Sequence, residues 1–194
     1  MKKLLYTLLA VSIIFSACEE DTPLPAPNNN SSLDIGDTHQ GGIIFYLDGN
    51  GGGLVAAPTD SDSAVDWDCA GISILGAGGT AIGTGAQNTI DIEAGCSSSG
   101  TAADICANLT LGGYSDWFLP SKDELNEMYL NIGLGSSLGN IGNFIGDGKV
   151  LFYWSSSQVS ANYAWWQELS GGAQYTSGDA TKDYAFYVRA VRAF

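Results

Sequence analysis

Few residues of this sequence could carry out catalysis. His39 is the only histidine, and a run of serines occupies residues 155–157. A serine hydrolase needs a histidine base between nucleophile and carboxylate, and no G-x-S-x-G turn surrounds these serines. Residues 142–149 lack the glycine spacing of a phosphate loop, and Val150 stands where Ser or Thr would hold magnesium. We interpret the serines as a turn of hydroxyls and predict no enzyme activity.

Four aspartates form an acidic cluster, Asp60, Asp62, Asp66 and Asp68. Calcium prefers carboxylate oxygens, and alternating acidic residues can surround it. The glycine and the closing glutamate of an EF-hand loop are absent. We therefore favour a solvated loop and predict no metal or cofactor, with these aspartates as the candidates should Ca²⁺ bind.

The cysteines are Cys18, Cys69, Cys96 and Cys106. No C-x-x-C spacing supports zinc or redox chemistry. Cys106 falls on the apolar face of a predicted helix over residues 101–109, where a small thiol packs well. Cys69 and Cys96 lie in Gly- and Ser-rich loop, and an oxidising compartment permits a disulfide. We predict that they pair and that Cys106 stays a buried free thiol.

Two arginines stand three residues apart near the end of the chain, in an apolar segment predicted to be a strand. An unpaired buried charge is costly, so Arg189 and Arg192 need a carboxylate partner. We predict that Glu124 forms a buried or half-buried ion pair with one of them. The alternative is two solvated arginines and a glutamate that only caps its helix.

Aromatic residues concentrate in the last part of the chain. A sugar-binding platform needs flat aromatic faces, and Trp154, Trp165, Trp166 and Tyr175 are the candidates. Adjacent residues of a strand face opposite sides, so Trp165 and Trp166 cannot both enter the same core. The alternative, which we favour for most of these residues, is that they are core.

Hydrophobic periodicity and turn residues predict the elements that position these side chains. Ser121 and Glu124 form a capping box that begins the best-marked helix. We expect a hairpin at residues 43–47 and 54–57, an irregular segment at 70–100, helices at 101–109 and 121–132, and strands at 150–154, 163–169 and 184–193.

The N-terminus has the features of a lipoprotein signal peptide over residues 1–17. Two lysines precede an apolar run that is too short to span a bilayer as a helix. The run ends in small residues before Cys18, which resembles a bacterial lipobox, so we predict that Cys18 is the lipidated mature N-terminus. An ordinary signal peptide cut near Ala17 is the alternative.

The residues after Cys18 predict the location of the protein. The acidic residues 19–21 resemble the export signal of surface lipoproteins in the Bacteroidetes. Residues 18–33 then form a flexible, Pro-, Asn- and Ser-rich tether, and residues 34–194 the folded domain. We predict anchoring in the bacterial outer membrane, at the cell surface rather than facing the periplasm.

Composition limits the class of protein. The chain has 194 residues, of which 45% are hydrophobic, which excludes a disordered chain and favours one domain. Its net charge of −14 repels a phosphate backbone, so we expect no nucleic-acid partner.

Three motifs in a fixed order resemble a known family. They are GGYSDWFLPSKDELNEMY at residues 112–129, YWSS at 153–156 and YVRAVR at 187–192. The segment GDTHQGGIIFYL resembles the opening of the same family. It comprises secreted bacterial domains typified by the C-terminal domain of the Legionella collagen-like adhesin and related to the Fibrobacter major paralogous domain.

The resemblance covers most of residues 34–194. It implies a single compact α+β domain, similar to C-type lectins and formylglycine-generating enzymes, with two or three short helices and a mostly antiparallel, irregular sheet. Those enzymes use a cysteine pair late in the domain, and no cysteine follows Cys106, so their activity is not implied.

We therefore expect a lipid-anchored, surface-exposed binding or adhesion module for a glycan or extracellular polymer. It would meet the membrane through its lipid anchor. The alternative is a structural envelope protein without a small ligand, and an uncharacterised enzyme is the third reading.

Overall fold

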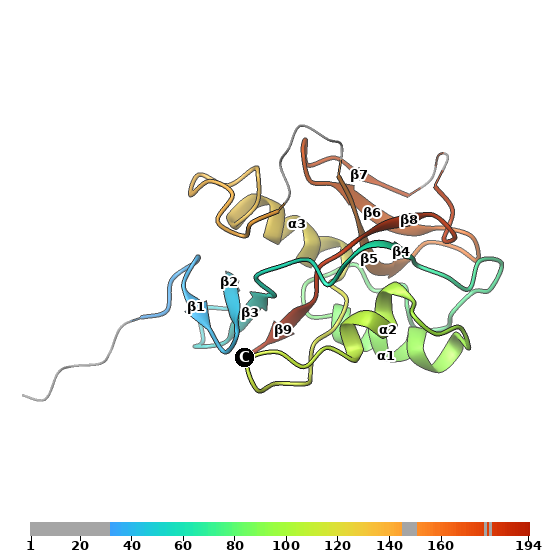
Figure 1. The fold of residues 1–194 in the computed structure, drawn as a ribbon, viewed down its shortest axis with the longest axis horizontal. Coiled ribbons are helices and arrows are strands. Elements are labelled where there is room, and N and C mark those ends of the chain that lie inside the picture. The colour runs from blue at the N-terminus through green and yellow to red at the C-terminus, as the bar shows by residue number, and fades with distance from the viewer. Residues whose placement is uncertain (1–31, 145–150, 177, 179) are drawn as a thin grey trace, which may run out of the picture. The chain divides into compact units, whose positions relative to one another are not determined.

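The computed structural model describes residues 32–144, 151–176, 178 and 180–194. Residues 33–194 form one compact unit. Its described part contains three short helices and two sheets, in which all strand pairs but one are antiparallel (Figure 1). The α+β class expected from the sequence is confirmed.

The first sheet has the strand order β1-β2-β3-β9. Its strands are β1 (Thr38–His39), β2 (Gly42–Leu47), β3 (Gly53–Ala56) and β9 (Val191–Ala193). Strands β2 and β3 are the predicted hairpin, because Ile44 pairs with Val55 in an antiparallel register. The carboxylate of Asp48 accepts backbone N–H groups of Asn50 and Gly52 and so fixes the turn between them.

The second sheet has the order β4-β8-β5-β6-β7. Its strands are β4 (Asp62–Asp66), β5 (Phe152–Gln158), β6 (Ala164–Glu168), β7 (Gln174–Tyr175) and β8 (Ala185–Val188). The pair β5–β8 is parallel, and β8 places the C-terminal segment inside the sheet between β4 and β5.

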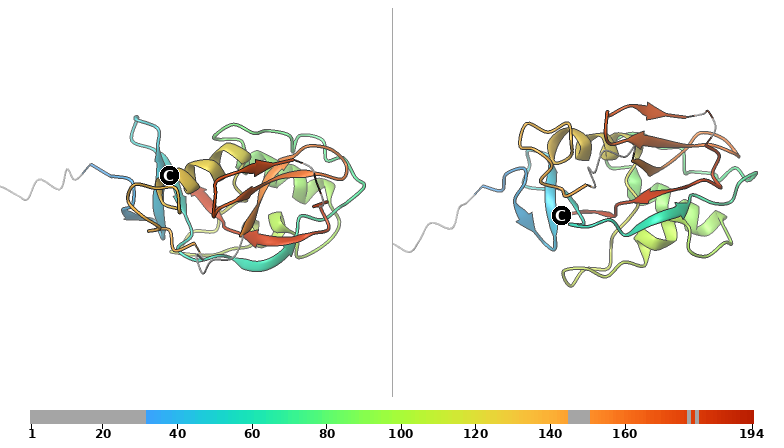
Figure 2. Two further views of the ribbon diagram at one scale, coloured as in Figure 1. Left: turned by 90° about the horizontal axis from the view of Figure 1, so that it is seen from above. Right: turned by 45° about the horizontal axis from the view of Figure 1, so that its top comes forward.

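The last predicted strand, over residues 184–193, is two strands in different sheets. β8 belongs to the second sheet and β9 to the first, with Arg189 and Ala190 between them (Figures 1 and 2). The apolar alternation continues across the break, so the sequence pattern does not reveal it. The C-terminal segment therefore connects the two sheets.

Helix α1 (Gly85–Gly95) lies within the segment that the sequence predicts to be irregular, so that prediction is wrong. The helix has glycines at both ends, and no side chain caps its N-terminus at Thr84. Its buried face includes two polar residues: Asn88 donates to Gly79 O at 2.6 Å, and Thr89 accepts from the N–H of Leu119. Tertiary packing stabilises this helix, whereas its local signal is poor.

The other two helices are close to the predicted ones. They are α2 (Ala102–Ala107) and α3 (Lys122–Asn131). The capping box is present: Ser121 Oγ accepts the N–H of Glu124, and Glu124 accepts the N–H of Ser121 at 2.7 Å. This local signal correctly placed the beginning of α3.

The serines at 155–157 belong to strand β5, so the predicted turn is wrong. All three are buried, and each hydroxyl has a partner. Ser155 donates to the backbone of β6, Ser156 accepts from Asn88, and Ser157 donates to Gly79 O at 2.6 Å. Ser155 links two strands of the sheet, Ser156 links the sheet to α1, and Ser157 links it to the segment before α1, so the three serines have a structural role.

The apolar core forms two clusters that share the strands. Alternate residues of a strand face opposite sides. Accordingly, Ile44 of β2 and Trp154 of β5 belong to one cluster, while their neighbours Phe45 and Tyr153 belong to the other. The second cluster also holds the buried face of α3.

Candidate functional site

The second sheet carries a pocket lined by aromatic side chains. Its volume is about 370 Å³. Its lining residues are Phe152, Trp166, Tyr175, Gly178, Ala180, Tyr184 and Phe186. Strands β5, β6, β7 and β8 supply most of the rings, so residues distant in sequence meet because the strands are neighbours in the sheet.

The rings of this aromatic pocket are packed around Trp166. Tyr175, its cross-strand neighbour, stacks on it with ring centroids 4.3 Å apart and an angle of 20°. Phe152 meets it edge-on at 4.8 Å, and Phe186 lies 5.2 Å away. Such contacts hold aromatic side chains in fixed orientations, so the walls are preformed.

The pocket is partly open to solvent. Tyr184 is 47% exposed and Tyr175 37% exposed, whereas Trp166 is 9% exposed. Within the described residues, the indole Nε1 of Trp166 is buried and has no hydrogen-bond partner. Buried indole N–H groups usually have one, so this donor is unusual.

A carboxylate lies at the rim of the pocket. The hydroxyl of Tyr175 donates to Glu168 Oε2 at 3.3 Å. Desolvation, with the neighbouring Glu168 carboxylate, raises the pKa of Tyr175. Aromatic faces beside a carboxylate acceptor can bind a ligand that has a C–H face and hydroxyl groups.

Only two of the four aromatic candidates from the sequence line this pocket, Trp166 and Tyr175. Trp154 is fully buried, and its indole N–H donates to Val65 O at 2.9 Å, so it is core. Trp165 faces the other side of β6, where the ammonium of Lys122 lies 5.0 Å from its ring. The opposite orientation of Trp165 and Trp166 follows from strand geometry.

The ligand-binding residues predicted from the sequence do not include Phe152, Tyr184 and Phe186. Tyr184 and Phe186 are two residues apart, which indicates a shared face of a strand. That signal could have identified the pair. Phe152 could not have been found in this way, because its place depends on the β5–β6 register.

A second hollow of about 560 Å³ lies between α1, α2 and the segment before α3. It is lined by Ala86, Thr89, Ile90, Glu93, Ala94, Ala107, Asp116, Trp117 and Phe118. Desolvation, and the nearby Asp104 carboxylate, raise the pKa of Glu93. The lining is mostly apolar, but it includes two carboxylates, and its two aromatic residues, Trp117 and Phe118, do not form a stacked pair like that of the aromatic pocket.

The predicted ion pair between Glu124 and an arginine is wrong. Arg189 is enclosed and pairs with Asp60: its Nε donates to Asp60 Oδ1 at 2.7 Å, and its Nη2 lies 2.7 Å from the same oxygen. The other Asp60 oxygen accepts the hydroxyl of Tyr153 at 2.9 Å. Burial raises the pKa of Tyr153, and the Asp60 carboxylate adds to the shift.

Arg192 has a different and more exposed partner. Its Nε donates to Asp116, its Nη1 donates to Gln40, and its guanidinium lies 3.8 Å from the ring centroid of Tyr114. The hydrogen bond from Arg192 lowers the pKa of Asp116. Each arginine therefore has its own carboxylate, as burial requires, and both carboxylates come from loops distant in sequence.

Glu124 is buried among backbone donors. Besides the cap at Ser121, it accepts the N–H of Gly83 at 2.7 Å. Burial raises the pKa of Glu124, and the backbone hydrogen bonds oppose the shift. A Cβ on Gly85 would clash with Glu124 Oε2 and would lie 2.8 Å from the backbone nitrogen of Ser121, so the buried carboxylate and its cap require glycine there.

The acidic cluster is dispersed by the fold. Asp60 is engaged by Arg189, Asp62 and Asp66 stand at the two ends of β4, and Asp68 accepts the N–H of Cys69. Among the described residues, no three His, Cys, Asp or Glu side chains are grouped closely enough to hold a metal ion.

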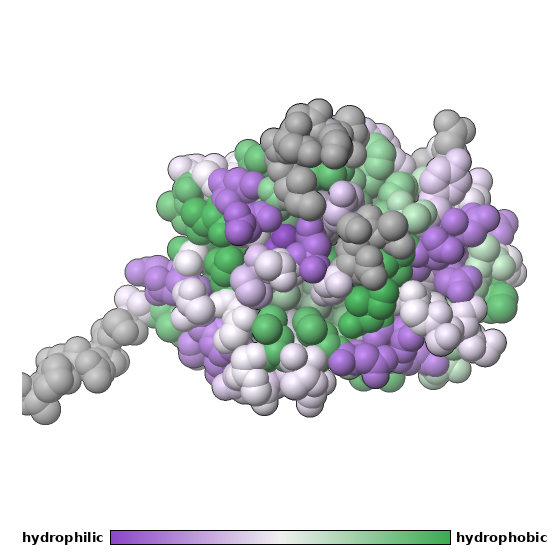
Figure 3. Space-filling model, in the orientation of Figure 1, coloured by the Kyte–Doolittle hydropathy of each residue, from purple (hydrophilic) through white to green (hydrophobic). Residues whose placement is uncertain are grey.

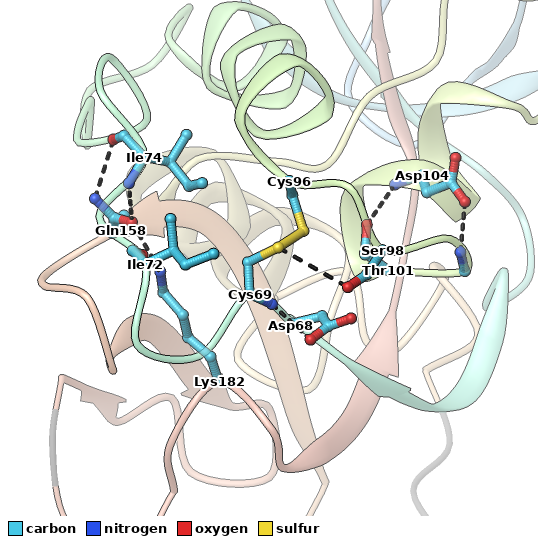
Figure 4. Close-up of a disulfide and its surroundings, with 11 residues drawn as sticks. Asp68, Cys69, Ile72, Ile74, Cys96, Ser98, Thr101, Asp104, Gln158 and Lys182 are labelled. Atoms are coloured by element: carbon cyan, nitrogen blue, oxygen red, sulfur yellow. Dashed lines mark hydrogen bonds between the residues drawn. A yellow bond between two sulfur atoms is a disulfide. The ribbon is translucent and has the colours of Figure 1, made fainter.

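Cys69 and Cys96 form a disulfide with Cα atoms 5.8 Å apart, the pairing expected from the sequence (Figure 4). Cys96 is the residue that ends α1, so the bond fixes this helix to the segment after β4. Cys106 is a buried free thiol, and burial raises its pKa.

Lys182 is fully buried, although no pattern in the sequence indicates it. Its ammonium donates to Ile72 O at 3.0 Å and to Gln158 Oε1 at 2.7 Å, as Figure 4 shows, and lies 4.2 Å from the centroid of the Trp67 ring. No carboxylate pairs with it among the described residues. Burial lowers the pKa of Lys182 to about 8.

The surface is polar with separate apolar groups. In Figure 3 hydrophobic colour gathers over the segment that follows α3, where Leu134, Leu138 and Ile141 are exposed. No helix in the described part of the chain has the length and hydrophobicity needed to span a membrane.

The sequence matches a known family. The family model of the Lcl C-terminal domain matches residues 58–192, which include both arginines, the disulfide and the aromatic pocket. No curated protein matches the sequence.

Proposed function

Because the chain belongs to the Lcl C-terminal domain family, we propose that it is a cell-surface binding or adhesion module for a glycan or extracellular polymer. An enzyme activity is not part of this proposal. The C-type-lectin-like relation of the fold stays a prediction.

The aromatic pocket is the observation that carries the proposal. It offers preformed rings, two of them half-exposed, and a rim carboxylate. Sugar rings have apolar C–H faces that stack on aromatic faces, and hydroxyl groups that donate to carboxylates. A pocket with these walls suits a sugar ring better than it suits an ion.

The charge of the chain narrows the class of polymer. The net charge is −14, and an acidic body repels sulfated or uronic polymers unless a cation bridges them. We therefore propose that the ligand is a neutral glycan or polymer.

The membrane attachment is a proposal about residues outside the described part of the chain. Cys18, the expected lipidation site, lies there, as do residues 19–31 of the predicted tether. We propose that acyl chains on Cys18 anchor the protein in the outer membrane with the folded unit at the cell surface. An acidic body gains no attraction from anionic lipid, so acyl chains must supply the affinity.

A glycan array tests the binding function. The wild-type protein and the Tyr184→Ala variant are compared, with Trp165→Ala as the matched control from the other side of the sheet. We expect retention of wild type and control on neutral glycans and at least tenfold weaker retention of Tyr184→Ala. If the wild-type protein is retained on none of the arrayed glycans or polymers, the proposal is contradicted.

A structural envelope protein is the second candidate. The exposed apolar residues Leu134, Leu138 and Ile141, which all lie in the segment after α3, favour it, because exposed apolar surface often marks a protein–protein contact. Strong self-association together with no retention on the array would support this reading instead.

A further inference from the structure

We propose that the end of the domain at which the chain enters it lies on a lipid bilayer surface, with the side chains of Leu134, Leu138 and Ile141 in the headgroup region. These three residues are called the aliphatic patch below. The inference rests on the lipid anchor at Cys18 proposed above, and it adds the orientation that the anchored domain takes on the membrane.

The aliphatic patch lies beside the point where the chain enters the domain. The compact unit begins at Leu33. A Cβ on Gly36, three residues later, would lie 2.7 Å from Cδ1 of Ile141 and 3.7 Å from a methyl group of Leu138. In Figures 1 and 2 the segment after α3 and the beginning of the domain lie at the same end of the longest axis. An anchor that precedes Leu33 therefore holds this end of the domain near the bilayer.

The distance from the proposed anchor favours contact with the bilayer. A flexible chain as long as the segment from Cys18 to Leu33 has an end-to-end distance of roughly 20 Å. Tethering at such a distance raises the effective concentration of the patch at the lipid surface, so a contact that is weak by itself becomes populated.

The composition of the segment after α3 suits a lipid surface. Leu134, Leu138 and Ile141 are exposed to solvent, and no charged residue occurs between Glu127 and Asp147. In Figure 3 hydrophobic colour gathers over this segment. Aliphatic side chains gain free energy when they enter the boundary between headgroups and acyl chains. This segment can enter that boundary without burying a charge, which would be costly.

Hydrogen bonds hold the patch in place on the domain. The hydroxyl of Ser136 donates to Asn131 O at 2.7 Å, at the end of α3, and accepts the N–H of Leu138 at 3.0 Å. The N–H of Gly142 donates to Ile132 O at 2.7 Å. The segment is therefore fixed to α3, and a membrane contact through it would orient the whole domain.

This orientation agrees with the binding function proposed above. The connection between β7 and β8 supplies Gly178, Ala180 and Tyr184 to the aromatic pocket. In Figures 1 and 2 this connection lies at the opposite end of the longest axis from the segment after α3. A domain that rests on the bilayer through the aliphatic patch therefore presents the aromatic pocket to the medium.

Charge near the patch predicts which lipid it prefers. Asp34 and Asp37, on either side of the entrance at Gly36, are exposed. Their carboxylates repel an anionic lipid, so apolar contact has to supply the affinity. We expect closer contact with a phosphatidylcholine bilayer than with one that contains phosphatidylglycerol.

The test is methyl NMR on the full-length protein, acylated at Cys18 and placed in phosphatidylcholine nanodiscs. Leucine and isoleucine methyl groups carry ¹³C, and a small share of the lipid carries a gadolinium chelate on its headgroup, which speeds the relaxation of nearby protons. We expect the relaxation enhancement at Leu138 and Ile141 to exceed that at Ile72 and Leu75 at least fivefold. Ile72 and Leu75 are the matched controls, because they are also exposed but belong to the segment after β4, at the far end of the domain.

Variants show whether the patch itself makes the contact. The double variant Leu138→Ser/Ile141→Ser should lower the enhancement at Leu134 at least threefold, whereas Ile72→Ser should leave it unchanged. Should the double variant fail to fold, Leu134→Ser provides the test, with at least a twofold loss at Leu138 and Ile141. Replacing half of the lipid by phosphatidylglycerol should lower the enhancement at the patch, and a rise would overturn the apolar basis of the contact.

The outcomes separate this inference from the proposed anchor. If mass spectrometry shows acylated Cys18 but the patch and the controls relax equally, the docking is wrong and the anchor stands. If Cys18 is unmodified in membrane-extracted protein, both proposals fail. Patch signals of the lipid-free Cys18→Ala variant that shift with protein concentration, together with equal relaxation in nanodiscs, would assign the patch to a second copy of the chain and overturn the lipid contact.

Discussion

Arg189 and Arg192 stand in the same short segment but in different dielectric surroundings. Arg189 is enclosed: besides Asp60, it donates to Ala57 O and Gly142 O at 2.9 and 2.7 Å. The side chain of Asp116, the partner of Arg192, is 62% exposed. Water screens an exposed pair strongly, whereas removing one partner of a buried pair leaves an uncompensated charge.

We therefore predict that Arg189→Met lowers the free energy of unfolding by about 3–5 kcal/mol. Arg192→Met should lower it by only about 1 kcal/mol, the level of an exposed pair. Denaturant unfolding of the two variants beside the wild type measures both values. Equal losses would show that exposure of the carboxylate does not set the strength of these pairs.

The buried Lys182 should make the free energy of unfolding depend on pH in a specific way. Its pKa is about 8 in the folded protein and about 10.4 in an unfolded chain, so between these values the unfolded state binds more protons. Stability then rises with pH in this window and falls as pH decreases from 10.4 through 8. Below pH 8 the lysine is charged in both states, and the full cost of burying the charge remains.

The corresponding experiment compares the wild type with Lys182→Met at pH 7 and pH 9.5. The wild type should gain about 2 kcal/mol relative to the variant across this interval. Subtracting the variant cancels the titration of the tyrosines, which have their own pH dependence. A difference that stays constant with pH would show that the ammonium is not penalised by burial.

At the scale of elements, α3 depends on a buried carboxylate at its beginning. Glu124 accepts N–H groups from Ser121 and from Gly83, which belong to different segments. Removing it leaves the buried N–H of Ser121 and the part-buried N–H of Gly83 without their acceptor. An unsatisfied buried donor costs roughly 1–3 kcal/mol. Losing the Ser121 hydroxyl removes mainly a helix cap, which costs about 1 kcal/mol.

We predict that Glu124→Ala destabilises the protein by about 2–5 kcal/mol and Ser121→Ala by about 1–2 kcal/mol. Glu127→Ala on the same helix is the matched control and should change stability by no more than about 0.5 kcal/mol. Chemical denaturation gives all three values. If Glu124→Ala and Glu127→Ala destabilised the protein equally, the buried carboxylate of Glu124 would have no stabilising role of its own.

The disulfide acts on α1, the helix with the poorest local signal. Cys69 and Cys96 are 27 residues apart, and closing such a loop stabilises by at most about 3.5 kcal/mol through chain entropy. We predict that the double variant Cys69→Ala/Cys96→Ala loses up to this amount of stability, measured by thermal or denaturant unfolding. Reductant should destabilise the wild type by a similar amount and leave the double variant unchanged; an effect on both would point to another cause.

At the scale of the whole molecule, local signals were predictable and long-range pairings were not. The box at Ser121 and Glu124 and the turn after β2 lie within a few residues, so the sequence alone indicates them. The partner of Arg189 is 129 residues away, and nothing in the alternation around Arg189 points to Asp60. The aromatic pocket likewise requires the strand order of the second sheet, which spacing does not reveal.

The proposed anchor predicts where the molecule is found. Mass spectrometry of membrane-extracted protein should show a mature chain that begins at an acylated Cys18. Cys18→Ala should move the protein to a soluble fraction, because a lipid-free acidic body has little affinity for the bilayer. An unmodified peptide that begins at another residue would contradict the proposal.

The burial of Lys182, Arg189 and Arg192 also affects how such a protein responds to digestion. Trypsin cuts after lysine and arginine in accessible, mobile backbone, and these three are the only basic residues of the segment 151–194. Trypsin applied to intact cells should therefore leave this segment uncut even where the protein faces the medium. A protease that cuts after exposed aromatic residues such as Tyr184 would detect the same molecule.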